Sequence, residues 1–286
     1  MRIGFIGAGV MGKTMGSLLG ACGYEIAGYF SRSETSAYRA TKEVGGKFYS
    51  DAAKLAASCD VLFITTPDDA VKEVVLGLSK SKCLGPGQFV VHMSGAHTSK
   101  ILQPAADCGA YVMSMHPLQS CASVEEALVN LPLCVFSLEG HPEAVKIGKI
   151  MVSRIGAEFF VLNAEDKVLY HAAACVASNY LVTLFDAALE LLDLSGVEKD
   201  CLVPALLPLI EGTLGNLRVM KPAGALTGPI SRGDIGTVAR HIKSLEENAP
   251  DILDLYKALG RRTLKIAWEK GKLKKDQLEE LKSLLS

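Results

Sequence analysis

Hydrophobic residues form short continuous runs in the first part of the chain and recur at helical spacing in the rest. Seven runs predict strands, at 2–6, 25–30, 60–66, 88–93, 110–115, 133–138 and 158–162. Between them, segments 10–22, 34–44, 68–79 and 142–154 have the apolar spacing of amphipathic helices. Alternation of fully apolar strands with helices is typical of a sheet covered on both faces. The pattern predicts an α/β fold, doubly wound, with a mainly parallel sheet.

Helical periodicity dominates after residue 163. Helices are expected at 165–194, 199–218, 235–247, 250–269 and 274–285. A chain of 286 residues is long enough for two domains. We therefore expect an α/β domain at 1–163, followed by an all-α C-terminal domain at 164–286.

Composition indicates which kind of partner to expect. With 30 basic and 31 acidic side chains the net charge is −1, so the chain has no overall field that attracts nucleic acid or an anionic membrane. The eight cysteines form no C-x-x-C pair and no zinc-type spacing, which predicts no metal site and a reducing, cytoplasmic location. The expected partner is a small molecule.

The apolar segment from Val168 to Phe185 approaches the length of a membrane span. Polar residues interrupt it, so we expect a buried helix of a soluble domain. The polar positions from His171 to Glu190 share one arc of the helix, which favours the wall of a polar cleft; a buried hydrogen-bonded network is the alternative. Further apolar runs at 180–192 and 202–212 exceed what a small helical domain easily buries. They predict a homodimer built on the helical domain.

A glycine motif follows the first predicted strand. Gly7, Gly9 and Gly12 form G-x-G-x-x-G, and Val10 and Met11 begin the helix after it. Glycines in this context allow a tight turn, approach of the backbone to a pyrophosphate and close packing of helix on strand. The position of the motif at the first strand-to-helix passage identifies the 1–163 segment as a Rossmann-type dinucleotide-binding domain. A structural turn without a nucleotide is the alternative.

The end of the second strand selects between dinucleotides. NAD-binding units normally place an acid there for the ribose 2′-hydroxyl. Here Ser31, Arg32 and Ser33 occupy the position and no acid does. A guanidinium and two hydroxyls suit a 2′-phosphate, so the sequence predicts NADP (NADPH); a surface arginine in a turn is the alternative.

The ends of later strands should face the same crevice, because ligands of doubly wound sheets bind beyond the carboxyl ends of the strands. Thr65, Thr66 and Pro67 follow one strand, and Ser94 and Gly95 follow the next. All five are candidate cofactor contacts. For the first three, a well-capped helix start is an equally good explanation.

Other polar residues are candidates for the substrate end. His116 precedes Pro117 at the end of a strand, which biases its backbone toward an extended conformation. Ser120 follows shortly after. In the helical region Thr227 lies in a predicted loop, and Arg232 could bind a carboxylate or pair with Asp234, the predicted cap of the next helix.

These motifs resemble the NAD(P)-dependent reductases that join a Rossmann domain to a helical domain like that of 6-phosphogluconate dehydrogenase. Pyrroline-5-carboxylate reductase, ketopantoate reductase and prephenate dehydrogenase are relatives in that superfamily. The likeness is greatest to a branch of predicted oxidoreductases, and it is carried by Ser94–Gly95, His116–Pro117, Ala177–Asn179 and Thr227–Asp234. It covers nearly the whole chain. The set marks a family and leaves the substrate open.

The resemblance assigns roles to several residues. His116 and Ser94 match the histidine and serine that handle the substrate hydroxyl in prephenate dehydrogenases, although the sequence continues with "LQS" where that family has glycine. His171 and Asn179 stand near the lysine and asparagine that polarise the carbonyl in ketopantoate reductases. We expect His116 to be the general acid, because an imidazole titrates near neutral pH, with His171 as the alternative. Arg232 or Thr227 would hold a carboxylate.

The expected function is hydride transfer between NADP and the carbonyl or imine carbon of a small carboxylate. Ketopantoate is the first substrate to test, by analogy, with a pyrroline-5-carboxylate-type imine or prephenate as alternatives. A protein of another class, an NADP-binding sensor without turnover, has the same fold. The polar stripe and His116 favour the enzyme, since a sensor needs no proton donor.

Overall fold

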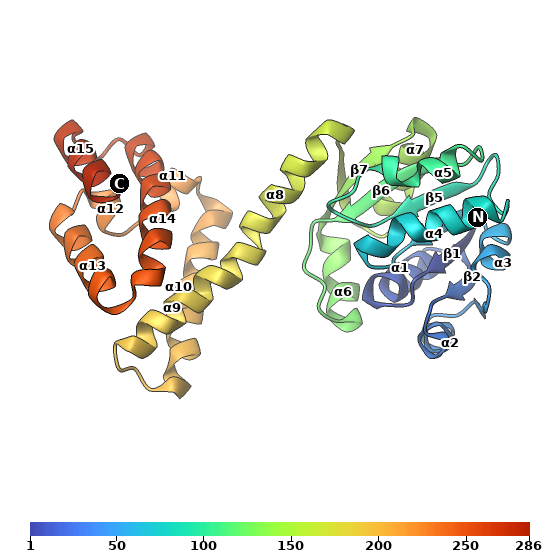
Figure 1. Ribbon diagram of the computed structural model, residues 1–286, viewed down its shortest axis with the longest axis horizontal. Helices are drawn as coiled ribbons and strands as arrows, with labels where there is room; N and C mark the ends of the chain where they lie inside the picture. The colour runs from blue at the N-terminus through green and yellow to red at the C-terminus, as the bar shows by residue number, and fades with distance from the viewer. The chain divides into compact units, whose positions relative to one another are not determined.

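The computed structural model describes residues 1–286 and divides into two compact units, Met1–Ser178 and Asn179–Ser286. Figure 1 shows the first unit in blue to green and the second in yellow to red. The first unit contains the whole sheet, and the second contains helices only.

The sheet has eight strands in the order β3-β2-β1-β4-β5-β6-β7-β8. They are β1 Arg2–Ile6, β2 Glu25–Phe30, β3 Lys47–Phe48, β4 Val61–Ile64, β5 Phe89–His92, β6 Tyr111–Pro117, β7 Val135–Gly140 and β8 Glu158–Val161. Every neighbouring pair is parallel except β6 with β7. The predicted mainly parallel sheet is confirmed, and the chain reverses strand order beside β1, where such sheets bind ligands.

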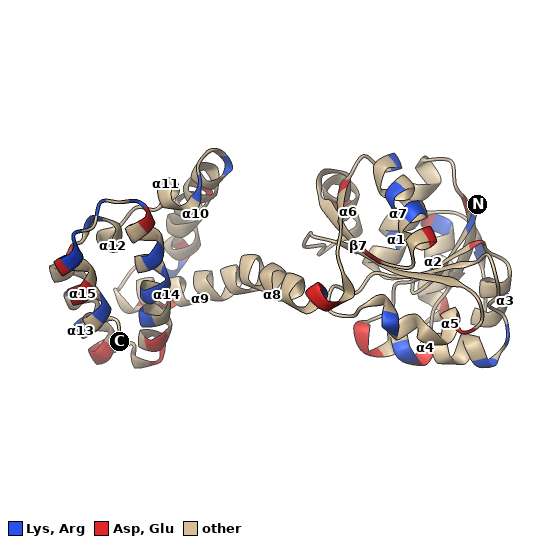
Figure 2. Cartoon of the chain, turned by 90° about the horizontal axis from the view of Figure 1, so that it is seen from above, with Lys and Arg blue, Asp and Glu red and all other residues tan.

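Helices cover both faces of this sheet. They are α1 Val10–Ala21, α2 Glu34–Glu43, α3 Ala52–Ala57, α4 Asp68–Lys80, α5 Gln103–Ala106, α6 Val124–Asn130 and α7 Pro142–Arg154, with 3-10 turns at Ser99–Leu102 and Leu131–Leu133. A 3-10 turn at Ala164–Asp166 and helix α8, Lys167–Ala177, follow β8, and α8 contributes no side chain to the apolar core on either face of the sheet. Buried residues of α1, α2, α6 and α7 form one core cluster, and those of α3, α4 and α5 form another. Figure 2 shows the sheet nearly edge-on, with α6, α7 and α1 on one side and α4 and α5 on the other. The doubly wound architecture follows.

The first unit continues beyond the boundary predicted between residues 163 and 164. The reason lies in α8: the Lys167 ammonium donates to the Ser114 hydroxyl on β6, and the Tyr170 hydroxyl lies 2.7 Å from Nδ1 of His116 on the same strand. A one-residue turn at Ser178 then separates α8 from α9, although the sequence predicts one helix over 165–194.

The second unit is a helical domain. Its helices are α9 Asn179–Leu194, α10 Lys199–Val219, α11 Pro222–Ala225, α12 Pro229–Arg232, α13 Ile235–Asn248, α14 Pro250–Glu269 and α15 Lys275–Leu284. The main core lies between α12, α13, α14 and α15, around Val238, Leu264 and Leu281. The Asp234 side chain accepts from the Thr237 N–H, which confirms it as the cap of α13.

The predicted burial of the apolar helix is wrong for a single chain. Residues Ala164–Leu194 form a stretch of 31 residues that is long and apolar enough to cross a membrane. Its most apolar 18-residue window has a mean hydropathy of 1.5, and none of that window is buried. Only Lys167 is buried in α8, and no residue is buried in α9 or α10. Apolar periodicity predicts that a helix face needs a partner, but it does not say whether the partner belongs to the same chain.

Candidate active site

The glycine motif forms the turn between β1 and α1. Gly7 has φ +110°, a conformation that L side chains rarely adopt. A Cβ on Gly12 would lie 2.3 Å from the Gly7 carbonyl oxygen, so only glycine lets the first turn of α1 approach the strand this closely. A Cβ on Gly9 would meet nothing within 4 Å, which leaves the N-terminus of α1 open to a ligand. Val10 and Met11, the first helical residues, pack against the core.

The segment after β4 supports the turn and faces it. The Thr65 hydroxyl donates to the Gly7 carbonyl oxygen at 2.9 Å, so Thr65 holds the glycine turn in place. Thr66 Oγ1 is buried and has no hydrogen-bond partner within the protein. Because a buried hydroxyl normally finds a partner, Thr66 is suited to contact a bound ligand. Pro67 is exposed as the cap residue of α4.

A hollow of about 350 Å³ extends from the carboxyl ends of β1 and β2 along α4 as far as Ser81. Its lining includes Ile6, Phe30, Arg32 and Thr66. The carboxylates of Asp51 and Glu73 also line it. Arg32 is exposed and forms no salt bridge, so its guanidinium is free to bind a phosphate.

The serines that flank Arg32 differ in their surroundings. The Ser33 hydroxyl accepts from the N–H of Ser36 and caps α2, whereas the half-buried Ser31 side chain forms no hydrogen bond within the protein. Ser33 therefore has a structural task at the start of α2. Its second lone pair accepts from the Ser36 hydroxyl, which reduces its capacity for a further contact.

Together these residues fit a dinucleotide. The open N-terminus of α1 supplies N–H donors and the positive end of a helix dipole for a pyrophosphate, and the unpartnered Thr66 hydroxyl lies in the adjoining hollow. Arg32 at the same hollow would meet the adenosine half. The predicted glycine, threonine and arginine positions are therefore brought to one edge of the sheet.

Ser94 and Gly95 follow β5 at the same edge. The Ser94 hydroxyl donates to a carboxylate oxygen of Asp68 at 2.7 Å and accepts from the N–H groups of Ala96 and His97. Its proton is therefore directed at Asp68 rather than at a substrate oxygen, which favours a role in shaping the loop. His92, the last residue of β5, is buried; burial lowers the pKa of its imidazole to about 3, so it is a neutral core histidine.

Gly95 allows two histidines to approach the end of β5. A Cβ at this position would lie 2.7 Å from a His171 ring carbon and 2.8 Å from Nε2 of His116. The two imidazole ring centres are 6.3 Å apart. In the parallel register His92 pairs with Ser114, so His116 lies two residues beyond the end of β5, where the sequence predicts its side chain to emerge.

The protonation state of His116 differs from the one that the sequence predicts. Burial, followed by the positive charge of Lys167, lowers its pKa to about 4. The expectation that this imidazole titrates near neutrality is therefore wrong, because strand periodicity does not reveal a buried cation beside it. His116 is neutral at pH 7 and acts there as a hydrogen-bond donor and acceptor rather than as an imidazolium.

Lys167 and Tyr170 are site residues that sequence analysis missed. Lys167 is fully buried, and its ammonium donates to the Ser114 hydroxyl at 2.6 Å. Burial lowers its pKa to about 8, while the charges of Glu139 and Asp68 oppose this shift. The signal was present in the spacing: residues 167, 170 and 171 lie on one face of a helix that carries no other charge before Asp186.

The sequence predicts roles at the substrate for four further residues. Ser120 is exposed after β6, with its N–H bonded to the Gln119 side chain. Asn179, the first residue of α9, is exposed, as are Thr227 and Arg232 in the second unit. Arg232 forms no salt bridge with Asp234. Substrate contacts by these four residues stay predictions.

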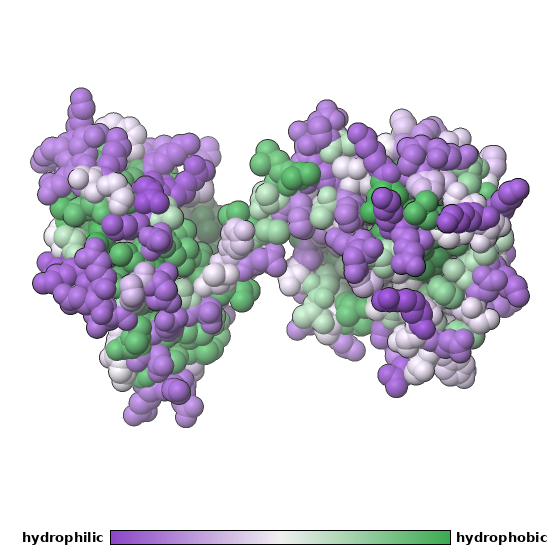
Figure 3. All heavy atoms as spheres, in the orientation of Figure 1, coloured by the Kyte–Doolittle hydropathy of each residue, from purple (hydrophilic) through white to green (hydrophobic).

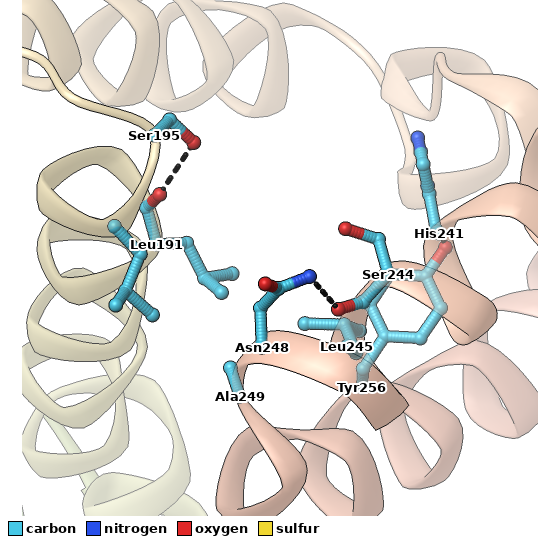
Figure 4. A pocket seen from close by; sticks show the side chains of 9 residues that line it. Leu191, Ser195, His241, Ser244, Leu245, Asn248, Ala249 and Tyr256 are labelled. Atoms are coloured by element: carbon cyan, nitrogen blue, oxygen red, sulfur yellow. Dashed lines mark hydrogen bonds between the residues drawn. The ribbon is translucent and has the colours of Figure 1, made fainter.

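The second unit contains a hollow of its own, of about 630 Å³. Figure 4 shows Leu191 and Ser195 facing Asn248 and Leu245 across it, with Tyr256 from α14 at one side. Nδ1 of His241 lies 2.9 Å from the Tyr256 hydroxyl. No charged side chain lines this hollow, so it lacks the means to bind a phosphate or a carboxylate by charge.

Comparisons with known proteins agree with this organisation. A family model for a Rossmann-like domain matches residues 1–117, and one for a domain of unknown function, DUF2520, matches residues 134–263. No curated protein matches the sequence. The Rossmann-like match lies within the predicted α/β segment, 1–163. The DUF2520 match covers the end of that segment and most of the predicted helical segment, 164–286.

Solved structures share the fold over nearly the whole chain. Protein TM1727 from Thermotoga maritima is 27% identical, with a TM-score of 0.74 over 95% of this chain and 100% of that one. BF3122 from Bacteroides fragilis, provisionally named an NADP oxidoreductase, is 23% identical, with a TM-score of 0.72 over 92% and 98%. Pyrroline carboxylate reductase from Plasmodium falciparum, solved with NADP bound, is 15% identical, with a TM-score of 0.58 over 100% and 98%. The predicted resemblance and fold class are confirmed.

Proposed function

We propose that this chain, which belongs to the proteins that join a Rossmann-like domain to a DUF2520 domain, is an NADP-dependent oxidoreductase. Its reaction is hydride transfer between nicotinamide and the carbonyl or imine carbon of a small carboxylate. The observation that carries the proposal lies at one sheet edge: a dinucleotide cradle at the β1–α1 turn and, past β5 and β6, the cluster of His116, Tyr170 and His171. The structural neighbours named for NADP and for pyrroline carboxylate support it.

Protein groups have two tasks in such a reaction, binding the dinucleotide and donating a hydrogen bond to the substrate. When bound, NADPH supplies the hydride. The N–H groups at the start of α1, the Thr66 hydroxyl and the Arg32 guanidinium bind and orient the dinucleotide. Neutral His116 donates a hydrogen bond from Nε2 to the substrate oxygen or nitrogen, and Gly95 leaves the space for that approach.

Turnover distinguishes this enzyme from a sensor that only binds the cofactor. We expect the purified protein to oxidise NADPH with at least one member of a panel of 2-oxo acids, including ketopantoate, and cyclic imines, including pyrroline-5-carboxylate. The fall in absorbance of NADPH measures the reaction, and the same panel with NADH serves as control. Tight NADPH binding without turnover across the panel would favour the sensor.

The panel also separates the two substrate classes. A neutral imidazole can donate to a carbonyl oxygen, whereas an imine that is already protonated needs no further proton before it accepts a hydride. Ketopantoate remains the first carbonyl substrate to test. The exposed Arg232 guanidinium and Thr227 hydroxyl are the proposed partners of the substrate carboxylate.

The uncovered helices of the second unit support a homodimer. Several large apolar side chains of α9 and α10 are 41–78% exposed, namely Tyr180, Val182, Leu194, Val203, Leu207, Leu209, Leu214, Leu217 and Val219. Figure 3 shows hydrophobic side chains gathered over these helices, and Figure 2 shows the long stretch without charge in α8 and the start of α9. A second copy of the chain offers the same apolar surface, so the two can bury each other in a symmetric interface.

We expect a dimer on this basis. Light scattering at micromolar concentration should give twice the mass of 30.4 kDa. Replacing Leu209 with Asp, at an exposed position in α10, should shift the protein toward monomer, because a desolvated charge opposes association. A wild-type monomer mass, or recovery of the protein only with lipid vesicles, would overturn the dimer.

A further inference from the structure

The Tyr170 hydroxyl contacts Nδ1 of His116, the ring nitrogen opposite the one that faces Gly95. The hydroxyl oxygen lies 2.7 Å from Nδ1, and the two rings meet edge to face with centres 5.8 Å apart. Nε2, on the opposite side of the imidazole, faces Gly95 at the open end of β5. The imidazole therefore bridges the tyrosine and the region where the substrate is proposed to bind.

A buried cation lies beside this pair. The Lys167 ammonium is 5.9 Å from the centre of the Tyr170 ring. It forms no salt bridge; it donates a hydrogen bond to the Ser114 hydroxyl, while the carboxylates of Glu139 and Asp68 act on it from farther away. Burial of a cation without an ion pair is unfavourable. Such an arrangement contributes little to stability and points to a functional reason for the charge.

The charge and the hydrogen bond together select one tautomer of His116. A nearby ammonium disfavours an imidazolium, so the ring carries a single proton. A phenol is a stronger acid than a neutral imidazole N–H, so the arrangement expected for the shared hydrogen bond has the Tyr170 hydroxyl as donor and Nδ1 as acceptor. The imidazole proton then resides on Nε2, the nitrogen that faces Gly95.

We propose that Tyr170 and Lys167 are positioning residues of a proton relay through His116, which deepens the proposed function and rests on it. As the substrate oxygen or nitrogen gains negative charge, the Nε2–H bond breaks and the substrate O–H or N–H bond forms. In the same step the Tyr170 O–H bond breaks and an Nδ1–H bond forms, so the imidazole stays neutral. Burial raises the pKa of Tyr170 and so disfavours the phenolate left behind; attraction to the buried Lys167 ammonium, 5.9 Å from the ring centre, offsets part of this cost. After the product leaves, solvent protonates Nε2 and the Nδ1 proton returns to the phenolate oxygen, which restores the starting tautomer.

Two measurements on the full-length protein test the relay. We expect nitrogen NMR of histidine-labelled protein to show the Nε2–H tautomer for His116, identified by its loss in His116→Asn, and to show a mixture of tautomers in Tyr170→Phe. In kinetics, Tyr170→Phe should lower kcat about tenfold without changing the Kd for NADPH. On the His116→Asn background the same substitution should have no further effect, since Tyr170 acts through His116.

Tyr111→Phe is the matched control, because Tyr111 lies on β6 at the end away from His116 and stacks against Phe89. It should leave both the tautomer and kcat unchanged. The relay is overturned by an Nδ1–H tautomer in the wild type, by an unchanged kcat in Tyr170→Phe, or by an equal effect of that substitution on the His116→Asn background. If the wild type reduces no compound of the panel, the proposed function fails, and the tautomer alone then decides whether Tyr170 positions His116.

Discussion

Replacement of His116 by Asn is expected to lower kcat by about 10²–10⁴, the range observed when a general acid is lost. Asparagine keeps a polar side chain but cannot take a proton at one nitrogen and release another. The Kd for NADPH should change little, because His116 lies on β6, away from the glycine turn of β1 and α1. Steady-state kinetics with the best substrate of the panel, together with a fluorescence titration of NADPH, measures both quantities.

His171→Asn is the control that separates the two candidate proton donors. His171 lies on α8, and its ring also approaches Gly95, but its hydrogen-bond partner is the Cys175 thiol rather than a tyrosine. We expect a smaller loss of kcat in this variant. Near-normal turnover of His116→Asn with abolished turnover of His171→Asn would move the proton donor to the helix.

The pH dependence follows from the lowered pKa of His116. Burial and the Lys167 charge bring this pKa to about 4, so His116 stays neutral as the pH rises from about 5 to 7. The kcat of the wild type should therefore show no limb from His116 in that interval. A limb between about pH 6 and 7 that disappears in His116→Asn would show an imidazolium donor.

Much of the first unit could be predicted because its signals are local. The seven predicted strands occur within a few residues of their predicted bounds, and α1, α2, α4 and α7 follow the apolar spacing closely. β3 has only two residues, and α3 and α6 have six and seven, so none is long enough to show a period. Burial of α8 and α9 was mispredicted because it depends on what packs against them.

Prediction of the site succeeded where backbone geometry determines the residue. Gly7 and Gly12 are required by the turn itself, and the position of His116 follows from strand register. The protonation of His116 could not be predicted in this way, because it depends on Lys167, which is distant in sequence and buried only in the folded unit. A lysine ordinarily indicates a solvent-exposed face, and only contacts reveal the exception.

Arg32→Asp is expected to weaken NADPH binding by about 2–3 kcal/mol, from the loss of charge-assisted hydrogen bonds and the added repulsion of a 2′-phosphate. NADH binding should change far less, since NADH has no phosphate at that position. Arg32 lines the hollow at the ends of β1 and β2 and is not engaged in a salt bridge. Titration of each variant with both dinucleotides, monitored by the fluorescence of the reduced nicotinamide, gives the two affinities.

Arg39→Asp provides the matched control for this change in charge. Arg39 lies on α2, is exposed and does not line the hollow, so its replacement alters the net charge equally without touching the proposed phosphate site. Its effect on NADPH binding should be small, because exposed charges at a distance are screened by salt. A preference for NADH over NADPH would also have a physical basis in this hollow, because the carboxylate of Asp51 or Glu73 can accept a hydrogen bond from a ribose 2′-hydroxyl. Wild-type protein that binds NADH at least as tightly as NADPH would assign the hollow to those carboxylates and remove Arg32 as the residue that selects the cofactor.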